Sequence, residues 1–304
     1  MKNNKENLDG IFLPLTTPFL KDESIDWDGL KRNMGFYANS KARGFLTLGS
    51  NGENKSLDDD EKLKILETVL RYKAPHQKII TACFVETTRQ ALRFIKKVDS
   101  MEIDYFNLLP PFYFRSRMTD EVLAGYFTEC AEGSAKPVLL YNAPKFSGVT
   151  LSPELVTKLS GHENIAGIKD SASSGIEKFI EAVPDDFVVM AGSIGFLFPA
   201  VVSGAVGGVI SMANFFPDLT QELYLLGKEK NMEKGEKLHL GLSDVNKKIS
   251  GAYGVAGVKA AMDLMGLVGG LPRKPLLGLK EDQKEKLRRD LEEAGLLNHV
   301  RKGC

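Results

Sequence analysis

The feature that most constrains the fold is an alternation of short apolar runs with amphipathic segments. Eight runs rich in Val, Ile, Leu or Phe recur between residues 11 and 214, and most of them end in Gly, Ser, Asn, Asp or Pro. Such runs are typical of strands that are buried on both faces of a parallel sheet. They are IFLPLTT from Ile11, GFLTLGS from Gly44, KIITACF from Lys78, DYFNLLP from Asp104, PVLLYNAP from Pro137, IAGIKDS from Ile165, FVVMAGS from Phe187 and VGGVISMAN from Val206.

The segments between the runs have the pattern of helices that pack on such a sheet. Residues 57–73 and 87–101 are two examples, and the first contains the acidic first turn that a helix dipole favours. Eight strand–helix units in a row predict an α/β fold, a (β/α)8 TIM barrel, rather than an open doubly wound sheet. No G-x-G-x-x-G motif follows the first run, which argues against a dinucleotide-binding fold.

The strand signal stops after residue 214, and only helical patterns follow it. We therefore predict two parts: a catalytic barrel over residues 1–224 and a C-terminal helical extension over residues 225–304. Within the first part, we expect residues 1–9 to be a flexible tail. No Pro/Ser-rich linker separates the two parts, so we expect the extension to pack on the barrel.

Composition excludes several classes of function. Lys+Arg and Asp+Glu balance at 40 each, which argues against nucleic acid or an anionic membrane as a partner. No apolar stretch is long enough to span a bilayer, and the first ten residues lack the apolar core of a signal peptide. The cysteines and histidines are scattered without ligand spacing, so we expect no metal site. These features predict a cytoplasmic protein whose three thiols are reduced.

Lys169 is the most unusual residue at the predicted strand ends, where barrels of this type carry their active sites. It ends a run that is otherwise apolar. Alternation along the strand places Ile165, Gly167 and Lys169 on one face. If that face points into the barrel, desolvation favours the neutral amine, which attacks ketones to form a Schiff base. The competing interpretation is that Lys169 is merely the first polar residue of a surface loop.

Two neighbouring features strengthen the first interpretation. Tyr141 ends the preceding run, and a phenol there could transfer protons while a carbinolamine forms and dehydrates, unless it is only an aromatic residue of the barrel rim. In the motif GSNGE, Gly49 and Gly52 allow the backbone to approach a ligand closely. Successive N–H groups in such a turn can hold a carboxylate. The alternative for this motif is an ordinary Gly/Asn turn.

Taken in order, GSNGE, YNAP, GIKDS and AGS resemble the family of dihydrodipicolinate synthase and N-acetylneuraminate lyase, class I aldolases that handle pyruvate on a (β/α)8 barrel. The resemblance runs from LPLTTPF near the start to GGLPRKPL near residue 275. It implies a covalent imine between pyruvate and Lys169, proton transfer by Tyr141, and no cofactor or metal. It also implies small-molecule partners, a 2-oxo acid and an aldehyde, and a homotetramer built as a dimer of dimers.

The resemblance also assigns roles to other positions. Ser50 and Asn51 would meet the pyruvate carboxylate, with Ser50 relaying protons as a catalytic residue. Tyr113 would reach into the site of a neighbouring subunit and take part in catalysis there. Ser193 and Ile210 would line the pocket through their backbones.

Departures from the family pattern distinguish its branches. Synthases of the family carry an arginine after YNxP, where this chain has Phe146 next to Lys145. A lysine point charge replaces a bidentate arginine poorly, which argues against the synthase activity. The stretch AGSIGFLF has no acidic residue to hold the hydroxyl tail of a sugar, which argues against a neuraminate lyase. The asparagine of GSNGE and the stretches YFRSRM, AGSIGFL, GAVGGVISMAN and GVKAAMDLMG resemble the branch that contains 4-hydroxy-2-oxoglutarate aldolase.

We therefore predict a carbon–carbon lyase that converts a short 4-hydroxy-2-oxo acid to pyruvate and an aldehyde, or the reverse. A small pocket near Phe146, Ile194 and Phe196 would suit a short aldehyde such as glyoxylate, with Phe146 in contact with substrate. The first alternative is condensation of pyruvate with aspartate semialdehyde. The second is a non-catalytic homologue that binds a ligand without forming an imine.

Overall fold

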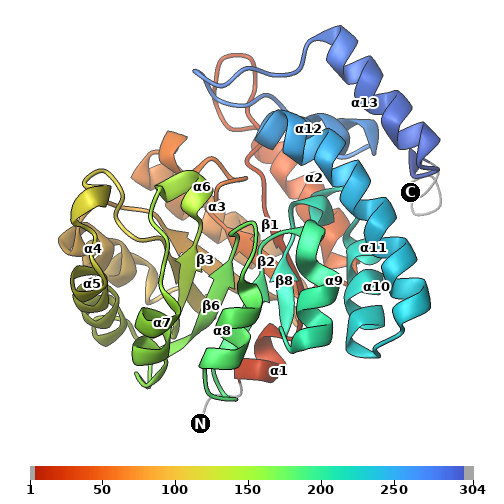
Figure 1. The fold of residues 1–304 in the computed structure, drawn as a ribbon. Helices are drawn as coiled ribbons and strands as arrows, with labels where there is room; N and C mark the ends of the chain where they lie inside the picture. Colours follow the sequence, from red (N-terminus) through yellow and green to blue (C-terminus); the bar gives the residue numbers. More distant parts are fainter. Residues whose placement is uncertain (1–3, 298–304) are drawn as a thin grey trace.

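The computed structural model describes residues 4–297 and shows a closed barrel of eight parallel strands surrounded by helices (Figure 1). Strands that follow each other in sequence pair with each other, and β1 pairs with β8 to close the barrel. The predicted (β/α)8 fold is confirmed. The strands are β1 Gly10–Pro14, β2 Gly44–Thr47, β3 Lys78–Cys83, β4 Tyr105–Leu108, β5 Val138–Asn142, β6 Ile165–Asp170, β7 Val188–Ala191 and β8 Gly207–Val209.

The barrel helices cover the outside of the strands. Helix α3 illustrates why they form: a capping box joins Asp58 to Glu61 at its start, and it buries Ile65, Leu66 and Val69 towards the barrel. The barrel helices are α2 Trp27–Ala38, α3 Asp59–Tyr72, α4 Thr88–Val98, α5 Asp120–Glu132, α7 Pro153–Ser160, α8 Ile176–Ala182, α9 Ile194–Ser203 and α10 Pro217–Lys228, and shorter turns are η1 Asn54–Ser56, η2 Arg115–Arg117, α6 Pro144–Ser147 and η3 Ser211–Asn214.

Two hydrophobic cores hold this arrangement together. The larger core lies between the strands and the helices, and the smaller one fills the inside of the barrel. Successive side chains of a strand alternate between them, so the barrel is packed and is not a pore. The inner core contains Phe12, Leu46, Ile80, Tyr105, Leu139, Tyr141, Val188, Met190 and Val209.

Strand β6 departs from strict alternation. Val138 of β5 is opposite Ile165, but the next residue of β5 is opposite Gly167, so Ala166 is an extra residue in β6. The bulge places Ile165 in the outer core and Ala166 in the inner core. The prediction that Ile165 shares a face with Lys169 is therefore wrong. Beyond the bulge alternation resumes, so Gly167 and Lys169 do share a face.

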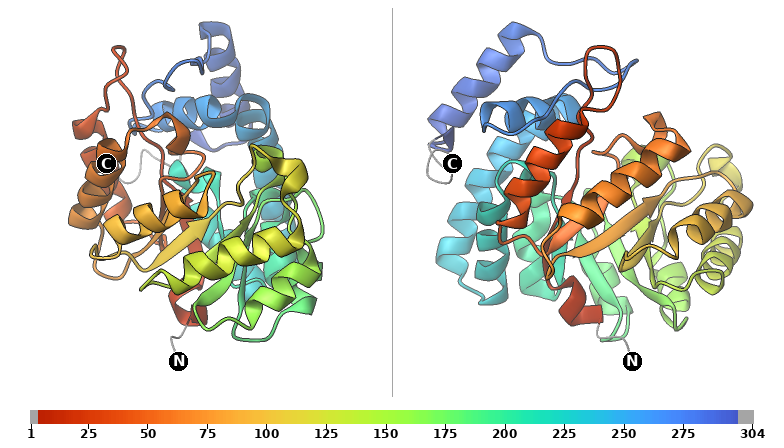
Figure 2. Two further views of the ribbon diagram at one scale, coloured as in Figure 1. Left: turned by 90° about the vertical axis from the view of Figure 1, so that its left-hand side faces the viewer. Right: turned by 180° about the vertical axis from the view of Figure 1, so that it is seen from behind.

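The N-terminal segment is not the predicted flexible tail. Residues Asn4–Leu8 form the short helix α1 at the end of the barrel where the strands begin (Figures 1 and 2). Leu8 is buried in the inner core, and the Asn4 side chain accepts a hydrogen bond from the Tyr105 hydroxyl. Arg43 donates hydrogen bonds to two carbonyl groups of this helix. The segment therefore closes the amino end of the barrel; residues 1–3 lie outside the described residues.

The predicted boundary at residue 225 also needs correction, because it falls inside α10. This helix packs on α9 and on β1, and so it is the eighth helix of the barrel. The extension starts after it, and α12 lies at the end of the barrel opposite α1 (Figures 1 and 2). Among residues 4–297, no helix is long and apolar enough to cross a membrane. The extension consists of α11 Met232–Asn246, a π-helical turn Lys247–Gly251, α12 Ala252–Leu264 and α13 Glu281–Glu293.

Candidate active site

Lys169 and Tyr141 form an amine–phenol pair at the ends of β6 and β5. The two residues are opposite each other in the strand register, and the Lys169 Nζ lies 4.1 Å from the centre of the Tyr141 ring. Lys169 is only 6% exposed, and Phe84 from the end of β3 stacks on Tyr141 with a centroid distance of 5.8 Å. The two side chains at these neighbouring strand ends are therefore in contact. The amine is thus largely shielded from water, beside a phenol that can transfer protons.

The residues that follow this pair lock the two strands together from the opposite face. Asn142 donates a hydrogen bond from Nδ2 to Asp170 Oδ1 at 2.7 Å, and the same oxygen accepts from the Ala172 N–H. Asp170 Oδ2 has no hydrogen-bond partner among residues 4–297. Burial raises the pKa of Asp170, and the two hydrogen bonds only partly oppose that shift. This contact therefore fixes β5 against β6 where the amine–phenol pair lies.

The GSNGE loop, residues 49–53, lies at the same end of the barrel, after β2. Leu48 before it and Glu53 at its end have φ angles of 56° and 55°. This left-handed region is uncommon for residues that carry a Cβ atom. The loop is therefore a constrained turn and not an ordinary surface connection.

Successive amides of the loop are free. The N–H groups of Gly52 and Glu53 donate hydrogen bonds back to carbonyl groups within the turn, at 3.1 Å each. In the part of the chain that the structure describes, the N–H groups of Ser50 and Asn51 have no acceptor. The Asn51 side chain is engaged elsewhere, because its Nδ2 donates to Ser211 Oγ at 2.9 Å. Two adjacent free amides form the kind of concave site that binds an anion such as a carboxylate.

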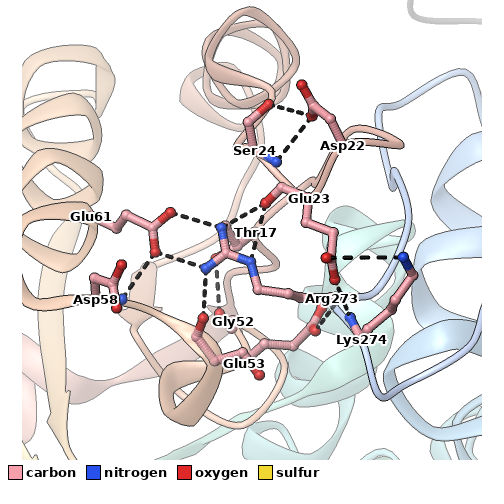
Figure 3. A network of polar contacts seen from close by, with 11 residues as sticks. Thr17, Asp22, Glu23, Ser24, Gly52, Glu53, Asp58, Glu61, Arg273 and Lys274 are labelled. Carbon is pink, nitrogen blue, oxygen red and sulfur yellow. Dashed lines mark hydrogen bonds and ion pairs between the residues drawn. The ribbon is translucent and has the colours of Figure 1, made fainter.

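A buried polar network joins this loop to the C-terminal extension. Lys259 of α12 donates to Glu53 Oε1 at 2.5 Å and to the Leu271 carbonyl at 2.7 Å. The other oxygen of Glu53 accepts from the Arg273 N–H, and the Arg273 guanidinium makes a two-pronged ion pair with Glu61 of α3 (Figure 3). Burial lowers the pKa of Lys259, although Glu53 opposes that shift.

Sequence reasoning missed this network as well as the contact between Asn142 and Asp170. Glu53, Lys259 and Arg273 all lie in stretches that support the family resemblance. The sequence does not show that these residues pair with each other, because Glu53 is more than 200 residues away from both partners in the chain. Only the packing of the extension on the barrel brings them together.

A cavity of about 250 Å³ opens beside the loop. Phe84 connects it to the amine–phenol pair, because this ring both lines the cavity and stacks on Tyr141. Of the three residues predicted near the aldehyde, only Phe146 lines it. Ile194 is buried in the outer core, and Phe196 packs against that core. The lining consists of Ser50, Glu53, Asn54, Lys55, Ser56, Phe84, Leu109, Phe112, Phe146 and Leu276.

Lys55 is the cationic side chain in the lining of this cavity. Its Nζ donates to the Phe84 carbonyl at 2.6 Å and lies 3.7 Å from a Glu86 oxygen and 5.2 Å from the centre of the Phe112 ring. Burial lowers the pKa of Lys55, while the charge of Glu86 opposes that shift. An anionic group in the cavity would meet this ammonium group.

Of the predicted site residues, Ser50 and Phe146 line that cavity, whereas Lys169, Tyr141, Asn51, Tyr113, Ser193 and Ile210 do not. Tyr113 is 77% exposed and packs edge-on against Phe114. Ser193 caps the start of α9, and Ile210 is buried just after β8, where its N–H donates to the Phe12 carbonyl. Across the described part of the chain, no three His, Cys, Asp or Glu side chains gather in a way that could hold a metal ion.

Comparison with known proteins places this chain in a family. The profile of the Dihydrodipicolinate synthetase family matches residues 7–294. The 4-hydroxy-tetrahydrodipicolinate synthase of Methanopyrus kandleri is 30% identical over 294 residues, which cover 95% of this chain and 97% of that protein. The crystal structure of dihydrodipicolinate synthase from Acinetobacter baumannii, complexed with pyruvate, has a TM-score of 0.89 and 26% identity, covering 95% of this chain and 99% of that one.

A variant of the 2-keto-3-deoxygluconate aldolase of Sulfolobus solfataricus has the same fold. Its TM-score is 0.85 at 23% identity, with 94% of this chain and 96% of that chain covered. Members of the family are lyases that work as class I aldolases, through a Schiff base between pyruvate and a lysine. Because the family profile matches almost the entire length, the chain belongs to the dihydrodipicolinate synthetase family and is a class I pyruvate aldolase.

Proposed function

We propose that Lys169 carries the pyruvate imine and that the protein cleaves or forms a short 4-hydroxy-2-oxo acid such as 4-hydroxy-2-oxoglutarate. One observation carries this proposal: the buried Lys169 amine lies 4.1 Å from the centre of the Tyr141 ring at the carboxyl end of the barrel. The free amides of Ser50 and Asn51 belong to the same end and supply a site for the substrate carboxylate. The amine itself is the covalent catalyst, so the reaction requires no cofactor.

Cleavage begins when the Lys169 amine attacks the 2-keto carbon and the carbinolamine loses water to form an iminium ion. Tyr141, assisted by Ser50, accepts the proton of the 4-hydroxyl group. The C3–C4 bond then breaks, and its electron pair forms the C2–C3 double bond of an enamine while the aldehyde departs. Protonation of the enamine at C3 and addition of water release pyruvate and regenerate the amine.

The cavity beside the loop supports a short, acidic aldehyde such as glyoxylate. Its volume of about 250 Å³ is below the range typical of sites for drug-sized ligands. Lys55 offers one cation to a carboxylate, and Phe146 offers an apolar wall. We also propose that the backbones of Ser193 and Ile210 contact the substrate.

The second candidate is condensation of pyruvate with aspartate semialdehyde. It is favoured by the name of the Methanopyrus kandleri relative, a 4-hydroxy-tetrahydrodipicolinate synthase. Lys145, beside Phe146 in α6, is the cation that would replace the missing arginine there. A non-catalytic binding protein is the third candidate, and the burial of the amine against a phenol argues against it.

We also infer a homotetramer, a dimer of dimers, in which Tyr113 enters the site of a neighbouring subunit. Two large adjacent aromatic side chains, Tyr113 and Phe114, are exposed, which is typical of an interaction surface. We place the protein in the cytoplasm, where reducing conditions preserve free thiols such as Cys83 and Cys130. Burial raises the pKa of the Cys130 thiol to about 12, which keeps it unreactive.

The decisive experiment traps the imine. The protein is incubated with pyruvate, reduced with borohydride, and analysed by intact mass and peptide mapping. One reduced pyruvate adduct on Lys169 is expected, and the Lys169→Met variant should carry none. A folded wild-type protein without an adduct would contradict the proposal. Product formation with glyoxylate but not with aspartate semialdehyde would then support the first candidate, and the reverse would support the second.

A further inference from the structure

The orientation of the two free amides in the GSNGE loop is set by hydrogen bonds within the loop. The Ser50 carbonyl and the Asn51 N–H belong to one peptide group and point in opposite directions, because the group is planar and trans. The Glu53 N–H donates to that carbonyl at 3.1 Å, and so it directs the Asn51 N–H away from the turn. The carbonyl of Gly49, held by the N–H of Gly52, directs the Ser50 N–H in the same way.

Glu53, whose N–H makes one of these bonds, has a left-handed backbone conformation. A glutamate in that conformation is unfavourable, and such residues persist only where their surroundings hold them. Two side-chain hydrogen bonds hold the backbone of the loop and of the residue before it. Thr17 Oγ1 donates to the Gly52 carbonyl at 2.9 Å, and Asn54 Nδ2 donates to the Leu48 carbonyl at 2.7 Å. Neither of these ties involves the side chain of Glu53.

The extension supplies the ties to the Glu53 side chain. Oε1 accepts from Lys259 at 2.5 Å, and Oε2 accepts from the Arg273 N–H at 2.9 Å. Lys259 is fully buried, and its ammonium also binds the Leu271 carbonyl. A side chain on Gly269 would collide with the Lys259 backbone, so this segment packs closely against α12. Both carboxylate oxygens of Glu53 are therefore held by residues of the extension.

Stability alone is a poor explanation for this buried pair. The desolvation of two charges costs about as much as their attraction returns, and apolar pairs of similar size often replace buried ion pairs without loss. An apolar pair would not supply the directed hydrogen bonds that Lys259 and the Arg273 N–H make to the two oxygens of Glu53. The pair is thus suited to fixing the conformation of the loop.

We propose that the Lys259–Glu53 ion pair is a positioning device that holds residue 53 in the left-handed conformation and keeps the Ser50 and Asn51 amides directed at the pyruvate carboxylate. The C-terminal extension then takes part in substrate binding. Figure 3 shows how Glu53 and Arg273 meet between the loop and the extension. The inference rests on the proposed function, because it takes this loop as the carboxylate site.

The test compares two double variants, E53V/K259M and E53G/K259M. Both remove the ion pair without leaving one buried charge unpaired. Valine disfavours the left-handed conformation strongly, whereas glycine adopts it freely. Packing alone would rank the variants in the opposite order, because valine fills more of the vacated space than glycine does. The quantity measured is the pyruvate concentration that gives half-maximal borohydride trapping on Lys169.

We expect half-maximal trapping by E53V/K259M to require about tenfold more pyruvate than in the wild type, and E53G/K259M to recover part of that loss. Maximal trapping should stay at one adduct per chain. Leu291→Ala, a change at a buried site of α13 away from the loop, is the matched control. It should lower the melting temperature and leave the pyruvate requirement unchanged.

Three outcomes would overturn the inference. They are an unchanged pyruvate requirement in E53V/K259M, an equal loss in both double variants, and a similar loss in Leu291→Ala. If E53V/K259M does not fold by circular dichroism, E53Q/K259M replaces it, because glutamine also disfavours the left-handed region. A wild-type protein that gives no adduct would overturn the proposed function and this inference together. Any of the three outcomes above, in a wild-type protein that does give the adduct, would overturn this inference alone, so the two failures are distinguishable.

Discussion

The two sides of the barrel mouth are built differently. On the side that we propose binds pyruvate, Lys169 and Tyr141 are buried on neighbouring strands, and the GSNGE loop is held from the barrel and from the extension. On the side that we propose binds the aldehyde, Phe146 is 56% exposed on the four-residue helix α6, and Tyr113 is exposed in the connection after β4. The first side is fixed by strand pairing and buried polar contacts, while the second depends on short connecting segments.

This difference shows where the chain can vary its chemistry. Imine formation needs an amine, a phenol and a carboxylate site in a fixed arrangement, and packed strands supply that precision. Recognition of the aldehyde needs only a few side chains on exposed segments, which tolerate substitution. Substitutions on the two sides should therefore have different effects. Those near Lys169 should abolish the reaction, and those near Phe146 should change which aldehyde is accepted.

The largest effect is expected from removal of the amine. Lys169→Met should lower the aldolase rate by more than about 10³-fold, because it removes the amine that we propose forms the imine. The measurement is pyruvate release from 4-hydroxy-2-oxoglutarate, with circular dichroism as the control for folding. Turnover within tenfold of the wild type would show that Lys169 does not carry the imine.

Removal of the phenol should have the next largest effect. Tyr141→Phe keeps the ring that packs against Phe84 and Lys169 but removes the hydroxyl group. We expect kcat to fall by about 10²-fold to 10⁴-fold, with a smaller change in KM, because proton transfer is lost while binding is kept. Steady-state kinetics with 4-hydroxy-2-oxoglutarate provide the measurement, and a kcat within twofold of the wild type would remove Tyr141 from the mechanism.

A substitution on the aldehyde side should exchange substrates without affecting the imine. Phe146→Arg introduces a bidentate cation, so kcat/KM should rise about tenfold for aspartate semialdehyde and fall for glyoxylate. Borohydride trapping of pyruvate should be unchanged. Phe196→Arg, at a position outside the cavity, is the control. Reduced pyruvate trapping in Phe146→Arg would mean that the two sides are not separate.

The smallest effect is expected from the contact that locks β5 to β6, and it concerns stability. Burial raises the pKa of Asp170, so the folded protein binds its proton more tightly than the unfolded chain does. The contribution of this group is then fully favourable below its unfolded pKa, near 3.8, and is lost as the pH rises through the raised value. The stability of the wild type relative to Asp170→Asn should therefore increase as the pH falls from 7 towards 4.

Urea unfolding of both proteins at several pH values checks this sign. The same comparison for Asp22→Asn, an exposed aspartate whose pKa is lowered mainly by its hydrogen bond to the Ser24 side chain, should show the opposite trend. A stability difference for Asp170→Asn that does not change with pH would contradict the inferred shift.

The sequence alone was sufficient for the barrel architecture and for the neighbouring positions of Lys169 and Tyr141. The alternation of apolar runs and amphipathic helices is a local pattern, and eight repeats of it leave few topologies other than a barrel. Lys169 and Tyr141 could be placed together because parallel strands all end at one rim and neighbouring strands follow each other in the chain. These inferences need only short-range periodicity and the rules of strand order.

Three features depend on tertiary packing and could not be predicted from the sequence: helix α1, the extra residue in β6 and the pairing of Glu53 with Lys259. Helix α1 is too short to be predicted from propensity, and it exists because Leu8 is buried in the barrel. The extra residue Ala166 reverses the alternation of β6 without a recognisable sequence signal. The pairing of Glu53 with Lys259 joins residues that no local pattern connects, because a contact across 206 positions depends on how the whole chain folds.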